Sequence, residues 1–191
     1  MRFPVDNFKT QFNTTAGNAF GAKVSYGYHS GADINGNGGG NTDTGTPLKA
    51  IASGIITSVV YQYSGYGNHL HLQFKTTDGR TYYAHYCHCQ TIYVKAGQTV
   101  AEGDLLATLG NTGNSTYAHL HFEIKNQPTG IDGIAKTTED LKKWENPIPF
   151  IEKHMIISLT PAQKEQKIRT IFGQNITSEE RLRQSDIVIH G

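Results

Sequence analysis

Hydrophobic and polar residues alternate along several short segments of the chain, most clearly from residue 119 to residue 124. Side chains on a β-strand point to opposite faces in turn, so the polar residues of this segment share one face and the apolar residues share the other. The polar face holds His119, His121 and Glu123, and the apolar face holds Leu120, Phe122 and Ile124. The pattern predicts a strand that presents two neighbouring imidazoles on the face opposite a hydrophobic core.

Other segments have the length and composition of strands and are separated by glycine, asparagine and aspartate turns. They cover residues 22–26, 47–52, 54–63, 69–74, 81–88, 94–100 and 103–110. This order favours a mainly β fold, an antiparallel and sandwich-like domain with Greek-key or meander connections. We expect an open groove on it.

The hairpin around Asp78-Gly79 has two candidate registers. A two-residue loop would place His85 opposite Leu72, on the apolar face, whereas a three-residue loop ending in a left-handed Gly79 pairs His85 with His71. The second register also pairs Thr76 with Arg80 and Cys87 with His69. A one-residue slip exchanges the two faces, so burial of the leucines favours the second register. It predicts that His69 and His71 line the groove floor near His85 without being primary metal ligands.

The chain changes character after residue 124. Residues 138–144 have the spacing of a short helix, and Asn146-Pro147-Ile148-Pro149 predicts that it ends in extended chain. Helix caps at Thr160-Pro161 and at Thr177 with Glu180 predict further short helices. We therefore expect a β domain over residues 1–151 and a helical appendage over residues 152–191, in which no chemistry is visible.

The length, composition and net charge of the chain limit the classes of protein to which it can belong. A length of 191 residues with 37% hydrophobic residues suits one substantial core, and a formal net charge of +1 gives no footprint for nucleic acid or an anionic membrane. The first residues lack the apolar run of a signal peptide, and no segment is apolar enough to insert into a membrane. We expect a soluble monomer in which Cys87 and Cys89 are reduced or inert.

Histidine and aspartate supply candidate metal ligands. His29 and Asp33 are four residues apart with Gly31 between them, so they can converge on one cation if the backbone bends there. The alternative is a turn in which Asp33 caps its own backbone. At His119 and His121, one imidazole could bind a metal while the other faces a substrate. The glycine-rich segment 35–45 predicts a loop, either a wall of the groove or a solvated insertion.

Several of these motifs together resemble the lysostaphin-type zinc metalloendopeptidases, peptidoglycan hydrolases that include the LytM-like enzymes. The resemblance runs from about Phe20 to Phe150. The motifs that carry it are His29-Ser30-Gly31-Ala32-Asp33, Tyr83-Ala84-His85, Val94-Lys95-Ala96-Gly97-Gln98, Asn111-Thr112-Gly113-Asn114-Ser115, Ala118-His119-Leu120-His121-Phe122 and Asn146-Pro147.

The resemblance implies one catalytic zinc ion with His29, Asp33 and His121 as its ligands. It implies that His85 and His119 are the unliganded pair that faces the substrate. It further implies hydrolysis of peptide bonds in the stem peptides or cross-bridges of peptidoglycan, outside the cytoplasm at the cell wall. A phage lysis protein or a secreted protein without its signal peptide would both fit.

Five residues depart from what relatives of this type carry: His69, His71, Cys87, His88 and Cys89. They allow two interpretations, a second adventitious metal site or polar decoration of a groove strand. The function also has an alternative, a catalytically silent wall-binding or hydrolase-activator module that retains the fold.

Overall fold

The computed structural model describes residues 1–128, 135–157 and 162–163 of the chain. Its strands are β1 (Phe12–Asn13), β2 (Lys23–Val24), β3 (Gly27–Tyr28), β4 (Ala32–Gly36), β5 (Pro47–Lys49), β6 (Gly54–Val60), β7 (His69–Lys75), β8 (Thr81–Tyr86), β9 (Thr91–Ile92), β10 (Thr99–Val100), β11 (Leu105–Thr108), β12 (Leu120–Lys125) and β13 (Trp144–Glu145). Two short 3-10 helices, η1 (Ala16–Asn18) and η2 (Asp140–Lys143), accompany one α-helix, α1 (Pro147–Ile157).

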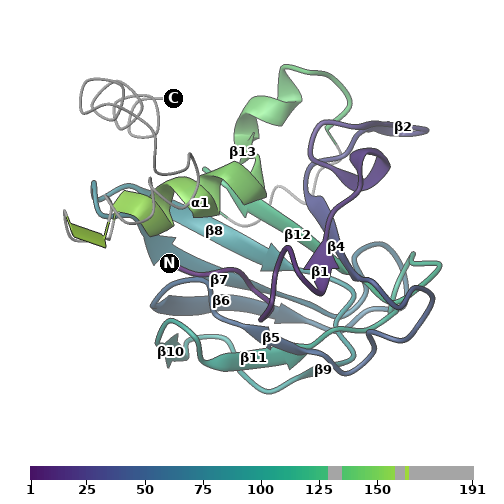
Figure 1. Ribbon diagram of the computed structural model, residues 1–191, viewed down its shortest axis with the longest axis horizontal. Coiled ribbons are helices and arrows are strands. Elements are labelled where there is room, and N and C mark those ends of the chain that lie inside the picture. The colour runs from purple at the N-terminus through teal and green to yellow at the C-terminus, as the bar shows by residue number, and fades with distance from the viewer. Residues whose placement is uncertain (129–134, 158–161, 164–191) are drawn as a thin grey trace.

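The strands form one large sheet and two small ones. The large sheet has eight strands in the order β1-β4-β12-β8-β7-β6-β10, with β13 paired to β12 at one end. The small sheets have the orders β5-β11-β9 and β2-β3, and β5, β11 and β9 run along the lower side of the molecule in Figure 1. The paired strands are antiparallel, which confirms the predicted mainly β, antiparallel fold.

The hydrophobic core joins the apolar face of the large sheet to the three-stranded sheet. Its fully buried side chains include Leu70, Leu72, Phe122 and Ile124 from the first and Leu48 and Leu106 from the second. The Tyr86 hydroxyl, also buried in this core, donates a hydrogen bond to the Lys49 carbonyl at 3.0 Å. Burial of these apolar side chains is the main stabilising contribution to the fold.

The β7–β8 hairpin adopts the predicted three-residue loop. Thr76 N donates to the Arg80 carbonyl at 3.0 Å, and Gly79 has the left-handed φ of 82° that this loop requires. His71 is therefore the partner of His85, as predicted. The alternation of β7, β8 and β12 then places one set of mostly apolar side chains in the core and the histidines on the opposite face.

This opposite face is buried, which the sequence does not predict. His69 is 3% exposed, His71 2% and His85 0%, so these side chains do not line an open groove floor. Buried polar groups must find partners inside the protein. The polar face of the large sheet is consequently a second interior, built from histidine and carboxylate in place of leucine.

The C-terminal part of the described chain also differs from its prediction. Only the short η2 forms within residues 138–144, and α1 begins at Pro147, where extended chain was predicted. Prolines fit the first turn of a helix because its N–H groups need no partner within the helix. Phe150 of α1 packs against Tyr82 with ring centroids 4.8 Å apart.

Helix α1 runs past the domain boundary that we predicted after residue 151 and ends at Ile157. The helices predicted from residue 160 onward lie outside the described residues, apart from residues 162–163. No helix in the described ranges is both long enough and apolar enough to cross a lipid bilayer. Cys87 and Cys89 are free and buried, and burial raises the pKa of both thiols.

Candidate metal centre

Two neighbouring strands bring the predicted ligands together. His121 of β12 is paired with Asp33 of β4, and His29 precedes β4 by three residues. Asp33 Oδ1 lies 2.9 Å from His121 Nδ1 and 3.1 Å from His29 Nε2, and the two ring nitrogens are 3.0 Å apart. Ligands of a tetrahedral zinc ion with bonds of 2.0–2.1 Å are about 3.3 Å apart. The donor set therefore fits zinc in both chemistry and spacing.

Gly31 allows this close approach. A Cβ atom at this position would lie 2.5 Å from the Phe122 carbonyl oxygen and 3.0 Å from His121 Cε1. Any larger residue would push the His29 to Asp33 segment away from β12. Glycine is thus required here for steric reasons, and its place between the two ligands is explained.

Hydrogen bonds fix the orientation of both histidine ligands. His29 Nδ1 donates to the Ala19 carbonyl at 3.1 Å, and His121 Nε2 donates to Glu123 Oε1 at 3.1 Å. In each ring the remaining nitrogen faces Asp33 Oδ1, where it would bind a metal ion in place of a proton. Such supporting contacts set the tautomer and the direction of metal-binding imidazoles.

The electrostatics of the centre favour a carboxylate beside imidazole. Burial raises the pKa of Asp33, but hydrogen bonds to His121 and His29 outweigh burial and hold that pKa well below its usual range. Burial lowers the pKa of His121, yet hydrogen bonds to Asp33 and Glu123 raise it to about 9. A metal ion that binds here must therefore displace a proton from His121.

His119 and His88 lie beside the three ligands. His119 Nε2 is 3.7 Å from Asp33 Oδ1, and the rings of His119 and His88 are 4.7 Å apart. His119 Nδ1 donates to the Tyr117 carbonyl at 2.8 Å, and His88 Nδ1 donates to the Thr112 carbonyl at 2.7 Å. Both rings are thus held through Nδ1, which leaves Nε2 of each as a proton acceptor.

His85 lies in the buried interior, away from the three candidate ligands. Its side chain is fully buried, its Nδ1 donates to Glu123 Oε2 at 3.1 Å, and its ring stacks on His71 with centroids 3.9 Å apart. A side chain without exposed surface cannot contact a substrate. The structure therefore brings together four of the five predicted site residues, and it puts His88 in the place expected for His85.

Glu123 connects the centre to the interior. Its Oε1 accepts from Ser30 Oγ at 2.6 Å and from the Tyr66 hydroxyl at 3.2 Å, in addition to His121. Its Oε2 accepts from His85 and from Trp144 Nε1, and forms an ion pair with Lys125 at 3.2 Å. Burial raises the pKa of this carboxyl, but the hydrogen bonds from His121 and His85 and the charge of Lys125 hold the pKa well below its usual range.

The glycine-rich loop after β4 borders the centre. Asn41 Oδ1 accepts a hydrogen bond from Ala118 N at 2.8 Å, directly before His119. At the base of the loop, Asp43 accepts from Gly36 N at 2.7 Å. The segment is thus tied to the rim of the site, which favours the interpretation as a wall over that of a free insertion.

Comparison with known families identifies the domain. The model of peptidase family M23 matches residues 27–133, more than half of the chain. The chain belongs to peptidase family M23. The match includes the three candidate ligands together with His88 and His119.

Related proteins agree with this assignment of the M23 domain. An uncharacterized metalloprotease of Haemophilus influenzae is 41% identical over 96 residues, which cover 50% of this chain and 18% of that protein. The peptidoglycan DD-endopeptidase ShyC of Vibrio cholerae is 35% identical over 92 residues, which cover 48% of this chain and 19% of that protein. Only 18–34% of the length of the first three curated relatives is matched.

Solved structures share the fold of the M23 domain. The catalytic domain of lysostaphin from Staphylococcus simulans has a TM-score of 0.54 and 29% identity, covering 72% of this chain and 92% of that one. A zinc-containing peptidase from Vibrio cholerae has a TM-score of 0.53 and 30% identity, covering 67% of this chain and 37% of that one.

Sequence analysis did not predict that His88 lies beside His119. One signal was available: Tyr86-Cys87-His88 repeats, three residues later, the Tyr-x-His spacing of Tyr83-Ala84-His85. Strand alternation conceals this signal. If β8 continued regularly, His88 would point to the same apolar face as Tyr86. The backbone at His88 has a φ of 60°, which breaks the alternation and turns the side chain toward His119.

Proposed function

We propose that this M23 domain is a zinc-dependent endopeptidase that hydrolyses peptide bonds in the stem peptides or cross-bridges of bacterial peptidoglycan. One observation carries the proposal. Three donor atoms lie within 3.1 Å of one another, and His119 Nε2 lies 3.7 Å from the carboxylate oxygen among them. Two similar proteins, a peptidoglycan DD-endopeptidase and lysostaphin, support the substrate class and a site of action at the cell wall.

His29 Nε2, Asp33 Oδ1 and His121 Nδ1 would hold the zinc ion. A bound zinc ion would polarise the scissile carbonyl and lower the pKa of the attacking water. The protein contributes rigidity to this step, because Ala19 and Glu123 hold the two imidazole ligands in place. Asp33 has 19% of its side chain exposed, so the centre is open to an incoming peptide.

His119 is the proposed general base. Its Nε2 accepts the proton of the attacking water and then donates it to the leaving amine, while its Nδ1 stays bonded to Tyr117. The side chain is 16% exposed, which lets it reach a substrate.

We assign the second unliganded imidazole to His88 in place of His85. Burial and the neighbouring His119 and His121 lower the pKa of His88 to about 4, so its ring is neutral at pH 7. The neutral ring keeps its Nε2 lone pair free for a proton from the reacting groups.

Purified peptidoglycan provides the test. Walls with direct cross-links and walls with glycine bridges are incubated with the protein, with and without a chelator, and new amino termini are counted. Zinc-dependent release from either wall supports the proposal and identifies the bond class. Binding to walls without release from any of them would favour the silent module and overturn the enzyme.

A further inference from the structure

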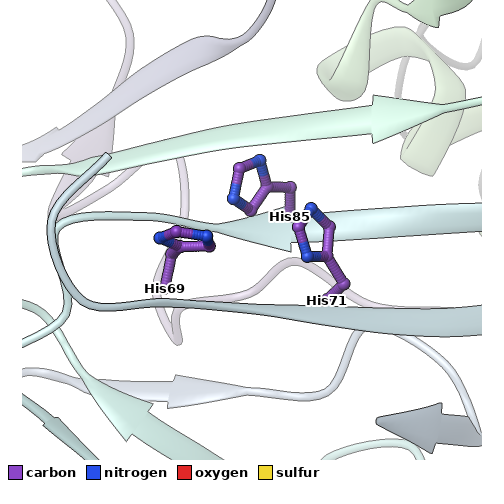
Figure 2. A group of neighbouring side chains, drawn as sticks. All are labelled: His69, His71 and His85. Carbon is purple, nitrogen blue, oxygen red and sulfur yellow. The ribbon is translucent and has the colours of Figure 1, made fainter. Parts of the chain in front are cut away.

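A second cluster of histidines lies inside the polar face of the large sheet. His69 and His71 of β7 and His85 of β8 direct their rings toward one another (Figure 2), and one ring nitrogen from each lies within 4.8 Å of the others. All three side chains are buried. The cluster shares no residue with His29, Asp33 and His121.

The hydrogen bonds of His69 and His85 place the ring proton on Nδ1 and leave Nε2 of each ring without a proton. His69 Nδ1 donates to the Gly67 carbonyl at 2.8 Å, and His85 Nδ1 donates to Glu123 Oε2 at 3.1 Å. A neutral imidazole with its proton on Nδ1 carries a lone pair on Nε2. This is the arrangement that carboxylates and carbonyls impose on metal-binding histidines.

Three ring nitrogens of this cluster lack ordinary partners. Within the described part of the chain, His85 Nε2 and both ring nitrogens of His71 are buried without any hydrogen bond. Buried polar atoms in folded proteins are nearly always paired, so three such atoms in two contacting rings require an explanation.

We propose that His69, His71 and His85 form a second, buried binding site for a divalent transition-metal ion of the zinc class. Three neutral imidazoles suit zinc, copper or nickel and do not suit calcium or magnesium, which prefer oxygen ligands. Burial against Tyr66, whose ring lies 4.7 Å from that of His85, makes the site structural. It stabilises the β7–β8 hairpin from the side opposite the core.

Binding requires one movement. The rings of His71 and His85 are stacked with an angle of 19° between their planes, so their in-plane lone pairs are nearly parallel. The His71 ring must turn out of the stack, and the three nitrogens must close from separations of up to 4.8 Å to about 3.3 Å. This turn breaks no hydrogen bond, because neither nitrogen of His71 has one within the described residues.

Zinc stoichiometry of the full chain tests the site without reference to activity. The protein is saturated with Zn²⁺, freed of excess ion and analysed by mass spectrometry for bound zinc. We expect two ions in the unmodified chain, one in His29→Ala, one in His71→Leu and none in the double variant. His154→Gln is the matched control, because His154 is also buried and unpartnered within the described chain, yet stands alone on α1. It should bind two ions.

One ion in the unmodified chain and none in His29→Ala would overturn the proposal. If His71→Leu does not fold, zinc-edge anomalous diffraction from crystals of the unmodified protein decides the question. A peak among His69, His71 and His85 supports the site. A single peak at His29, Asp33 and His121 overturns it.

Discussion

The two histidine clusters belong to the same face of the same sheet, yet they differ in charge and in access. The cluster of His29, Asp33 and His121 includes a carboxylate whose side chain is 19% exposed. The cluster of His69, His71 and His85 contains imidazoles alone, and all three side chains are buried. A metal site that opens to solvent suits chemistry on a substrate, whereas a metal site in a closed interior suits a structural role.

Glu123 contacts both histidine clusters. One of its oxygens holds His121 in the first cluster, and the other holds His85 in the second. The clusters are therefore neighbours that share one buried carboxylate. The two clusters come from the same sheet and differ in the side chains that cover them.

The largest expected effect comes from removing one ligand of the first cluster. His121→Ala leaves two protein ligands for the catalytic ion, so its zinc should be lost and wall hydrolysis should fall to the level of the chelated protein. Zinc content and release of amino termini are measured together. Retention of full zinc by this variant would show that the open cluster does not hold the ion.

Substitution of the unliganded pair should separate chemistry from metal binding. We expect His119→Ala and His88→Gln to keep the zinc of the first cluster and to lower the turnover number by about 10²- to 10⁴-fold, the usual contribution of general acid–base groups. His85→Gln should instead lower the zinc content of the saturated chain by one ion. Unchanged turnover in His88→Gln together with unchanged zinc in His85→Gln would reverse our assignment of the two residues.

Glu123→Gln should weaken both clusters at once. Residues that orient metal ligands typically contribute about 10- to 100-fold to metal affinity, and this carboxylate orients one ligand of each cluster. Competition with a chromophoric zinc chelator measures the two affinities. A loss confined to one cluster would show that the carboxylate is not shared in the way its contacts indicate.

Gly31→Ala should perturb the open cluster through the backbone. The added Cβ would meet the Phe122 carbonyl oxygen at 2.5 Å, and such overpacking typically lowers the free energy of unfolding by about 1–3 kcal/mol. Thermal denaturation of the metal-free protein measures the effect. Gly17→Ala is the control, because a Cβ there meets nothing within 4 Å and its backbone is not left-handed.

The smallest expected effect concerns the solitary His154. Burial lowers its pKa, despite the opposing influence of Asp78 and with further lowering by Lys153, Arg80 and the N-terminus. The unfolded chain therefore takes up the proton first, and the free energy of unfolding should decrease as the pH falls below about 6.5. The melting temperature of His154→Gln should decline less between pH 7 and pH 5 than that of the unmodified chain. Equal declines would assign the acid sensitivity to other groups.

Much of the site follows from the sequence because two of its three candidate ligands belong to adjacent strands with clear alternation. His121 and Asp33 are paired across β12 and β4, and the three-residue loop at Gly79 sets the position of His85 against His71. Alternation tells which side chains share a face. It does not tell what covers that face.

The unpredicted features come from tertiary contacts and local backbone geometry. Ser30, Tyr66 and Trp144 close over Glu123 from separate segments of the chain, so the polar face becomes an interior. The left-handed backbone at His88 moves one imidazole into the open site against the parity of its strand. At the C-terminal end, prolines that usually follow a helix instead begin α1, where its first turn accepts them.

Strand β12 links the proposed activity to the correct register of the sheet. Odd-numbered positions of this strand carry His121 and Glu123, and even-numbered positions carry Leu120 and Phe122 in the core. A chain that slips by one residue here exchanges the two sets and loses metal ligand and core packing together. In a mutant library, the proposed hydrolytic activity per mole of soluble chain would therefore count correctly folded molecules, and a screen for that activity would select for foldability at the same time.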